Sequence, residues 1–365
     1  MRRFYLLFSL LMLLFSLFSA ACAEVKPAKV YEAPKQIVIT FAGDCTIGCT
    51  PTQRNSASGF EAVVKKEGYQ YPFARMKRLF SGDDLTVVNL EGVFYNHEAN
   101  RVRKTYNFRA PTSFVKVLQL GSIEAVSIAN NHIYDYGIRG QQVTVETLNK
   151  AKIGWFGTTE NTRKTFVYKK DGIKIGFMAV YDRFYNGANN REFALNAVKK
   201  LKRDGCQVVI ACLHGGVEYQ LWHDRSQENI AHALTAAGAD IVIGHHPHVI
   251  EGIEVKNGRT ILWSLGNFVF GGNPRIKTPE TQHTYVARFT FSFDEKSTYL
   301  GHQLNIIPCH MSGEMDYNNY QPHMVQARYA REVLQQIQDD TKGLKLKPYI
   351  KGVGAIQEFV KAPKK

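Results

Sequence analysis

Six short runs rich in Val, Ile and Leu, separated by segments with helical patterning, constrain the fold of this chain more than any other feature. The runs are continuously apolar, which is typical of strands that are buried on both faces of a sheet. They begin at residues 37, 85, 125, 174, 208 and 241. Helical patterns lie between them, most clearly over residues 138–150, 192–203 and 226–237. We therefore expect a layered α/β/α fold.

The pattern changes after Gly252 to strands joined by short turns, predicted over residues 260–264, 284–293 and 301–308. Short turns join antiparallel strands, so mixed sheets are expected. Residues 324–340 have helical patterning, and a Lys-rich, peripheral tail follows them. We expect one main domain over residues 37–312, followed by a C-terminal helix and basic tail over 313–365.

The first 23 residues have the layout of a secretory signal peptide, with Arg2 and Arg3 before an apolar run that ends in small residues. Cleavage after Ala23 is the main expectation. Lipidation of Cys22 and retention of the segment as an uncleaved membrane anchor are the alternatives. Residues 24–36 contain two prolines and little apolar content, which indicates a tether. The sequence thus predicts an exported, extracytoplasmic protein that is either secreted or attached to the membrane by its N-terminus.

The chain is strongly basic, with 46 Lys and Arg against 32 Asp and Glu. This balance favours an anionic partner, such as a membrane surface, an anionic polymer or a phosphorylated substrate. Because the basic residues are dispersed, a generally solvated basic surface is the alternative interpretation. No basic motif is interleaved with aromatic residues, so a nucleic-acid partner is not expected. Six cysteines are too few for a disulfide-built scaffold, although Cys45 and Cys49 could pair or bind a metal.

Polar side chains stand where five of the predicted strands end. In chain order they are Asp44, Glu91, the pair Asn131–His132, His214 and the group His245, His246 and His248. The carboxyl ends of strands in an open α/β sheet face one crevice, so residues far apart in sequence converge there. Each residue alone could cap a turn or lie on the surface. Five such ends together predict a metal site.

The chemistry of these side chains narrows the metal. Carboxylate oxygen and imidazole nitrogen without thiolate suit Mn, Fe, Zn or Co better than Ca or Mg. The candidate ligands outnumber the needs of a single ion, and they fit two divalent metal ions about 3.5–4 Å apart with one bridging carboxylate. Glu91, which follows a central strand, is the candidate bridge. The predicted metal ligands are Asp44, Glu91, Asn131, His214, His246 and His248.

The motifs around these residues resemble the bacterial capsule synthesis CapA, or poly-γ-glutamate synthesis, family, a branch of the calcineurin-like metallophosphoesterase fold. They are FAGDCTIG at 41, VVNLEG at 87, ANNHIYDYG at 129, LHGGVEY at 213, IGHHPHVIEG at 243 and SLGNFVF at 264. The resemblance implies a metallophosphoesterase-like sandwich with mixed sheets. It also implies a role in the biosynthesis or export of capsule or poly-γ-glutamate, with membrane-bound synthase subunits as partners.

Two residues depart from the pattern of the wider superfamily, which is Asp-x-His, a bridging Asp, Gly-Asn-His, a lone His and Gly-His-x-His. Thr46 stands where the His of the first motif would be, and Glu91 replaces the bridging Asp. The resemblance therefore leaves open whether the first metal site is weak, differently ligated or absent. The matching residues are Asp44, the pair Asn131–His132, His214 and the group His246–Pro247–His248.

If the chain is catalytic, the resemblance implies hydrolysis at a phosphorus or acyl centre that the metal ions polarise. His132, beside a ligand, could protonate the leaving group, and Asp135 could orient its imidazole or simply stabilise a turn. Lys104 and Arg109 could bind an anionic substrate, or could belong to a solvated basic loop.

Two functions follow from this site. One is a metal-dependent hydrolase of phosphoester or glutamyl-polymer bonds. The other is an accessory subunit that handles an anionic polymer beside a membrane synthase. A hydrolase that acts on a cell-envelope phosphoester or polymer unrelated to capsule is the further alternative.

Overall fold

The computed structural model describes residues 34–159, 163–186, 190–272 and 278–364. The predicted signal peptide and most of the predicted tether lie outside these residues. Lys35–Lys365 form one folded unit. No helix in the described ranges is long and apolar enough to cross a bilayer.

The strands of this unit join into one continuous sheet of 16 strands. From one end to the other, its main path is β12 (Ile253–Lys256), β13 (Arg259–Leu262), β11 (Ile241–His245), β10 (Val208–His214), β9 (Ile173–Tyr181), β6 (Gly154–Thr158), β5 (Ala125–Ser127), β2 (Leu85–Leu90), β1 (Lys35–Cys45), β14 (His283–Phe293), β15 (Tyr299–His310) and β16 (His323–Met324). The strands β7 (Arg163–Lys164), β8 (Phe166–Lys170), β17 (Ala355–Ile356) and β18 (Val360–Lys361) pair with members of this path. A separate pair is formed by β3 (Val93–Phe94) and β4 (Arg109–Ala110).

The sheet is mixed, as predicted. The strands β1, β2, β5 and β6 are parallel neighbours, and so are β9, β10 and β11. The late strand β14 runs antiparallel to β1, with Ile39 opposite Phe289, and β15 runs antiparallel to β14. The structure therefore confirms both the buried parallel strands and the later antiparallel additions.

The two halves of the sheet fold back and face each other. The rings of Phe41 in β1 and Phe177 in β9 are 6.5 Å apart, although β9 is four strands away from β1 along the sheet. Near the other end, Thr260 Oγ1 of β13 and His302 Nε2 of β15 are 2.7 Å apart. The apolar side chains between the halves form one core, which the C-terminal helix α11 (Ala327–Asp339) also contacts.

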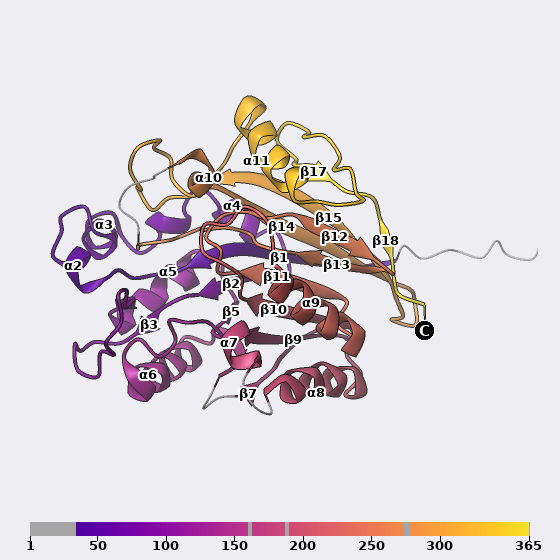
Figure 1. Ribbon diagram of the computed structural model, residues 1–365, viewed down its shortest axis with the longest axis horizontal. Coiled ribbons are helices and arrows are strands. Elements are labelled where there is room, and N and C mark those ends of the chain that lie inside the picture. The colour runs from indigo at the N-terminus through magenta and orange to yellow at the C-terminus, as the bar shows by residue number, and fades with distance from the viewer. Residues whose placement is uncertain (1–33, 160–162, 187–189, 273–277, 365) are drawn as a thin grey trace, which may run out of the picture. The chain divides into compact units, whose positions relative to one another are not determined.

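Helices cover the outer faces of both halves (Figure 1). The helices α8 (Asn190–Arg203) and α9 (Arg225–Ala237) pack against the half that contains β9, β10 and β11. The helices α3 (Phe60–Glu67), α5 (Val115–Leu120) and α6 (Gly137–Lys150) pack against the half that contains β1, β2 and β5. This arrangement confirms the layered α/β class, and α6, α8, α9 and α11 lie where the sequence predicts helices.

Short helical segments complete the fold. They are α2 (Pro51–Arg54), η1 (Tyr71–Phe73), α4 (Lys77–Phe80), η2 (Thr112–Phe114), α7 (Asp182–Tyr185) and α10 (Pro279–Gln282).

The two ends of helix α9 show how the sequence sets the boundaries of a helix. Asp224 accepts a hydrogen bond from the Gln227 backbone N–H at the start, and Gly238 ends the helix with a φ of 118°, which favours glycine.

The five cysteines of the described part are all buried and free. Cys45 and Cys49, which could have formed a pair, remain thiols, and burial raises the pKa of Cys49 to about 11.

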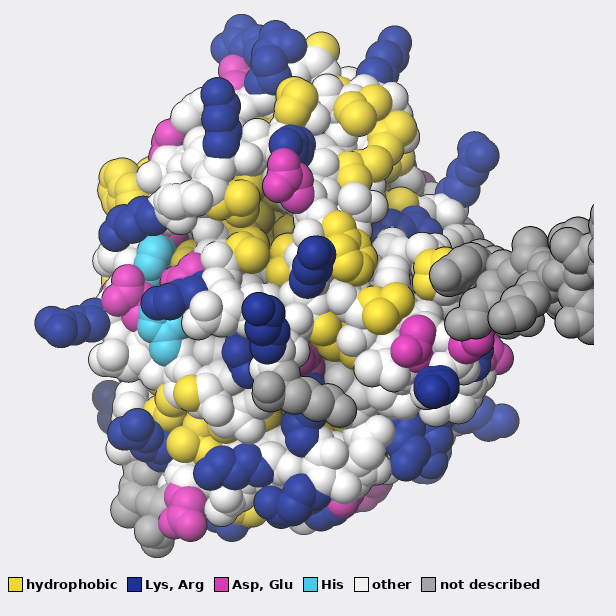
Figure 2. Space-filling view, turned by 90° about the vertical axis from the view of Figure 1, so that its right-hand side faces the viewer, with side chains coloured by type: hydrophobic (Ala, Val, Ile, Leu, Met, Phe, Trp, Pro, Cys, Tyr) yellow, Lys and Arg dark blue, Asp and Glu magenta, His cyan; other side chains and the backbone are white. Residues whose placement is uncertain are grey.

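Lys and Arg side chains are scattered over the face in Figure 2, between acidic and hydrophobic side chains. The basic charge of this face is therefore dispersed, as the distribution of basic residues along the sequence suggests.

Candidate metal centre

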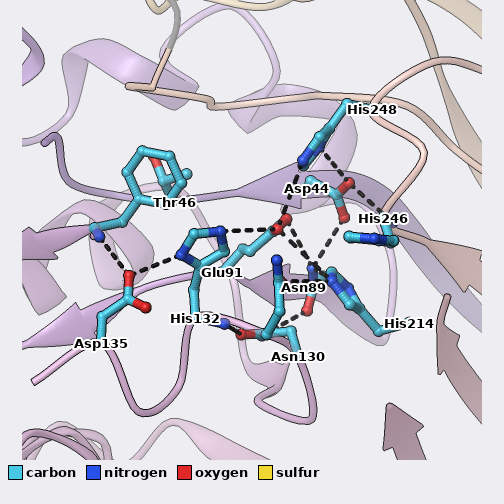
Figure 3. A network of polar contacts seen from close by, with 12 residues as sticks. Asp44, Thr46, Asn89, Glu91, Asn130, His132, Asp135, His214, His246 and His248 are labelled. Carbon is cyan, nitrogen blue, oxygen red and sulfur yellow. Dashed lines mark hydrogen bonds and ion pairs between the residues drawn. The ribbon is translucent and has the colours of Figure 1, made fainter. Parts of the chain in front are cut away.

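The carboxylate of Glu91, which directly follows β2, lies at the middle of the site. It is fully buried, and its Oε1 receives no hydrogen bond from the described residues. Three imidazole nitrogens face this oxygen: Nε2 of His214 and of His248 at 3.7 Å, and Nε2 of His132 at 3.9 Å (Figure 3). Because a buried charged oxygen without a donor is costly, this arrangement needs a cation or a proton to complete it.

The Asp44 side of the site consists of Asp44, Glu91 and His248, each of which offers one ligand atom within 4.8 Å of the others. Asp44 ends β1, and its Oδ2 lies 3.2 Å from His248 Nδ1. Its Oδ1 lies 3.0 Å from Nδ1 of His245. Asn267 Oδ1 is 2.9 Å from His248 Nδ1, so this contact orients the ring with Nε2 toward Glu91.

The His214 side of the site consists of Glu91, Asn131, His214 and His246. Glu91, His214 and His246 each offer one ligand atom, and these three atoms lie within 4.8 Å of one another. Asn131 Oδ1 is 2.9 Å from His214 Nε2, so the amide reaches the same place. His246 Nδ1 is buried and has no hydrogen-bond partner among the described residues. This side therefore offers four donors, one more than the Asp44 side.

The His246–Pro247–His248 turn carries backbone strain. His246 has a φ of 102° and His248 a φ of 61°, both in the left-handed region that non-glycine residues rarely adopt. Such conformations cost about 1–3 kcal/mol each. The backbone N–H of His246 donates to Asp44 Oδ2 at 3.2 Å, which helps to hold the turn. The strain lets two nearby residues serve the two sides of the site.

Close backbone packing explains a glycine of the first motif. A Cβ atom on Gly43 would lie 1.9 Å from the carbonyl oxygen of Gly266, so only glycine fits there. The contact brings β1 against the SLGNF segment, where the Asp44 backbone N–H donates to Gly266 O at 2.9 Å. Gly43 therefore sets the position of Asp44 relative to Asn267.

Burial and nearby charges give the histidines on the two sides of the site different pKa values. On the His214 side, burial lowers the pKa of His246 to about 3 and holds that of His214 well below its usual range. On the Asp44 side, burial opposes the charge of His248, but Glu91 and Asp44 raise its pKa to about 9. Burial would also raise the pKa of Asp44, but hydrogen bonds from His245 and His248 hold it well below its usual range. Burial and nearby Asp44 raise the pKa of Glu91.

His132 and Asp135 form a hydrogen-bonded pair beside Glu91. His132 Nδ1 lies 2.7 Å from Asp135 Oδ2, and Asp135 also accepts from the Phe108 backbone N–H at 2.5 Å. The Phe108 ring packs on the imidazole with centroids 4.4 Å apart. Burial lowers the pKa of His132, and Asp135 partly offsets this effect. The contacts of Asp135 fix the imidazole with Nε2 directed at the metal centre.

The two predicted substrate-binding residues occupy different places. Lys104 Nζ lies 2.7 Å from Asp135 Oδ1 and 3.2 Å from His132 Nδ1, so it contacts the pair. The Arg109 guanidinium instead donates to the Tyr95 carbonyl at 2.6 Å and to Glu98 at 2.7 Å. The structure thus brings Lys104, and not Arg109, to the candidate ligands.

Thr46, which stands where a ligating His was expected, has a structural contact set. Its hydroxyl donates to Gly48 O at 3.0 Å and accepts from the Gly271 backbone N–H at 2.8 Å.

The exposed Glu218 lies near the other end of the site, with one carboxylate oxygen within 4.8 Å of nitrogens of His246 and His248. Glu218 is therefore a further carboxylate beside the paired histidines.

Two asparagines of the site were not found by sequence reasoning. Asn89 Nδ2 donates to Asp44 Oδ1 at 2.9 Å and lies 3.3 Å from His214 Nδ1. Asn130 donates to Asn89 Oδ1 at 3.1 Å and to Leu90 O at 2.8 Å. Asn89 lies two residues before Glu91, and the period of two in a strand would have placed both on one face. That spacing was the available signal.

The model of "Bacterial capsule synthesis protein PGA_cap" matches residues 38–272, which include every candidate ligand. The chain belongs to this bacterial capsule synthesis family.

Curated relatives of this capsule synthesis chain agree with the match. The PGA biosynthesis protein CapA of Bacillus subtilis is 30% identical over 273 residues, covering 71% of this chain and 69% of the relative. The capsule biosynthesis protein CapA of Bacillus anthracis is 29% identical, covering 67% and 62%. A Mycobacterium tuberculosis relative, named "Probable polyglutamine synthesis accessory protein", is 26% identical, covering 51% and 55%.

Similarity of the capsule synthesis chain to solved structures is weaker. A phosphatase from Mycoplasma pneumoniae is 12% identical with a TM-score of 0.45, covering 79% of this chain and 97% of that one. A purple acid phosphatase from yellow lupin is 13% identical with a TM-score of 0.39, covering 86% and 58%. At these TM-scores the similarity does not bear on function, which has to be argued from the site.

Proposed function

We propose that this capsule synthesis family member is a metal-dependent hydrolase that acts on an anionic polymer during poly-γ-glutamate or capsule biosynthesis. The observation that carries the proposal is the bare Oε1 of Glu91, faced by three imidazole nitrogens. Most buried carboxylate oxygens are hydrogen-bonded, and Glu251 Oε1, the other one without a partner among the described residues, has no such set of imidazoles around it. The printed names of the Bacillus relatives, which refer to PGA and capsule biosynthesis, support the polymer as substrate.

The residues present fit divalent metal ions. Two buried atoms, Glu91 Oε1 and His246 Nδ1, have no hydrogen-bond partner among the described residues, and ligand atoms of Glu91, His214 and His246 lie within 4.8 Å of one another. Carboxylate, amide and imidazole ligands without thiolate suit Mn, Fe, Zn or Co, and we propose that Asp44, Glu91, Asn131, His214, His246 and His248 would hold two such ions. When bound, such ions supply Lewis-acid polarisation of a substrate oxygen and lower the pKa of a water molecule.

The chain's own residues supply the proton transfer. His132 directs Nε2 toward the site while Asp135 holds Nδ1, so the imidazole can pass a proton to a leaving group at Nε2. Lys104 lies beside both residues, and its charge opposes the protonation of His132 that Asp135 favours. Phe108 excludes water from one face of the ring. We propose His132 as the catalytic acid and Asp135 as the residue that positions it.

An accessory role is the second candidate. It is favoured by the Mycobacterium relative, whose printed name describes an accessory protein of polyglutamine synthesis. In that role the site would serve a membrane-bound synthase by handling or trimming its product. We propose that either role is performed outside the cytoplasmic membrane, with export directed by residues 1–23. Hydrolysis of a cell-envelope phosphoester unrelated to capsule is the remaining alternative.

The test combines metal content with hydrolysis by the full-length protein. Metal bound per chain is measured after incubation with Mn, Fe, Co or Zn, and hydrolysis of p-nitrophenyl phosphate and of poly-γ-glutamate is then assayed. We expect the His132→Gln variant to retain its metal and to lose about 100-fold or more in turnover, as for the loss of a general acid. His232→Gln is the matched control, since that half-buried residue of α9 pairs with Glu254 and is not a member of the site.

Three outcomes separate the candidates. Protein that binds none of the four metals would overturn the metal centre. Bound metal without hydrolysis of either substrate would favour the accessory role. Hydrolysis of the phosphoester without any effect on poly-γ-glutamate would favour the envelope phosphoester as substrate.

A further inference from the structure

A pocket lies beside the His132–Asp135 pair, which its lining residue Lys104 contacts. Its volume is about 480 Å³, within the range of about 300–1,000 Å³ of small-molecule sites. The loop 101–107 and the residues around the start of α2 line it. Arg101, Arg103 and Lys104 contribute three cations, and no acidic side chain of the described residues lines this pocket.

Two of the three cations are uncompensated. The exposed guanidinium groups of Arg101 and Arg103 form no ion pair within the part of the chain that the structure describes, whereas Lys104 pairs with Asp135. Hydroxyl and amide groups from Thr50, Thr52 and other residues provide the rest of the polar lining. Arg presents a planar fork of donors that matches a carboxylate or phosphate. The pocket is therefore suited to an anion.

Some basic residues elsewhere are compensated by acids. Lys170 pairs with Asp84 and Lys202 pairs with Asp240. The face shown in Figure 2 likewise mixes Lys and Arg with Asp and Glu. General surface charge does not explain three cations around one pocket without an acid, so this cluster differs from the dispersed background.

Lys104 joins the pocket to the reaction centre. Its Nζ donates to Asp135 Oδ1 at 2.7 Å and to the Asn131 carbonyl at 2.9 Å, while the same residue lines the pocket. Asn107, also in the lining, donates to the Asp135 carbonyl at 3.3 Å. A ligand in the pocket is thus separated by a single side chain from the proposed catalytic acid.

We propose that this pocket is a subsite for the carboxylate-bearing chain of the substrate, on the side of the scissile bond where His132 protonates the leaving group. The assignment rests on the proposed function for its connection to hydrolysis, but not for anion binding itself. Arg101 and Arg103 bind successive carboxylates of a glutamyl-type chain, while Lys104, whose Nζ is held by Asp135, His132 and Asn131, lines the end of the pocket nearest the centre. The pocket thereby favours a polymer over a small ester.

The experiment measures binding of a fluorescein-labelled γ-linked glutamate oligomer to the full-length protein by anisotropy. We expect the double variant Arg101→Gln/Arg103→Gln to bind at least about tenfold more weakly than the wild type, because two charge-assisted contacts are lost. Lys199→Gln/Arg203→Gln is the matched control, which removes the same charge from exposed positions of α8, far from α2 in Figure 1. This control should bind within about twofold of the wild type, since distant exposed charges are largely screened.

Metal content and p-nitrophenyl phosphate hydrolysis are measured on the same variants. Metal content should be unchanged in Arg101→Gln/Arg103→Gln, because neither arginine is a candidate metal ligand, and the hydrolysis rates show whether each variant is active. If no variant hydrolyses any substrate, the proposed function fails while the binding comparison still tests the subsite. Equal weakening in both double variants would overturn the subsite in favour of general charge attraction. Binding of a polyphosphate oligomer, but not of the glutamate oligomer, would overturn the assignment of a carboxylate chain.

Discussion

The Asp44 side and the His214 side of the candidate metal centre share Glu91 but differ in the contacts that their side chains make with one another. On the Asp44 side, the carboxylate is hydrogen-bonded to His245 and His248, and His248 has a pKa raised to about 9. On the His214 side, the pKa of His246 is lowered to about 3 and its Nδ1 has no partner among the described residues. The Asp44 side is therefore a hydrogen-bonded ion pair, whereas the histidines of the His214 side are neutral and can bind a metal ion without first losing a proton. We therefore expect the His214 side to bind the first metal ion.

The largest effect is expected from Glu91→Gln, because Glu91 is the donor that both sides share. Gln keeps the size of the side chain but removes the charge, so metal content should fall below about one tenth of the wild-type value. Metal bound per chain after dialysis provides the measurement. Glu192→Gln on α8 is the control and should retain its metal. A Glu91→Gln protein that still binds two ions would show that metal binding on the two sides does not depend on this carboxylate.

Single-histidine variants break the comparison one side at a time. His246→Ala should lower the affinity for the first ion by about 100-fold, and His248→Ala should lower only the affinity for the second. Loss of a residue that supports a ligand already lowers metal affinity about 10- to 100-fold, and loss of the ligand itself should have at least that effect. Calorimetric titration of metal into metal-free protein separates the two ions. If His248→Ala weakens the first ion as strongly as His246→Ala does, the order of binding proposed here is wrong.

The pH dependence of metal binding should also differ between the sides. His248, with a pKa of about 9, carries a proton at pH 7, and an ion on the Asp44 side must replace it. Affinity for the second ion should therefore rise about tenfold per pH unit between pH 7 and pH 8.5. His246, with a pKa of about 3, holds no proton in this range and adds no such dependence on its side. Mn²⁺ titrations at several pH values test this, and identical slopes for both ions would contradict it.

Thr46→Val should have the smallest effect on metal binding. Loss of the hydroxyl leaves the buried Gly271 N–H without its acceptor, which costs about 1–3 kcal/mol of folding free energy. The number of bound ions should not change, because Thr46 is not a ligand. Denaturant unfolding and metal content together provide the measurement. Thr235→Val, whose hydroxyl bonds only to its own helix at His232 O, should cost less than about 0.5 kcal/mol.

The sequence predicted those parts of the molecule that depend on local patterns. Continuous apolar runs identified the buried strands, and the polar residue after each run identified Asp44, Glu91 and His214, because strand ends share one edge of the sheet. The fold-back of the sheet was not predictable, since it depends on contacts such as Phe41 with Phe177 that local periodicity does not encode. The position of Arg109 was missed for a similar reason. Its partners, Tyr95 and Glu98, lie on a loop whose course the spacing of residues does not reveal.

The pairing of β1 has a consequence for how the protein is made. β1 meets β2 early, but its other neighbour, β14, begins only at His283, and the contact of Asp44 with His245 spans 201 positions. While the nascent chain is being synthesised, β1 is an unpaired edge, and the ligand set is incomplete until His248 has emerged. A chain that ends before His248 therefore lacks part of the candidate ligand set, so the proposed metal binding requires that most of the domain has been synthesised.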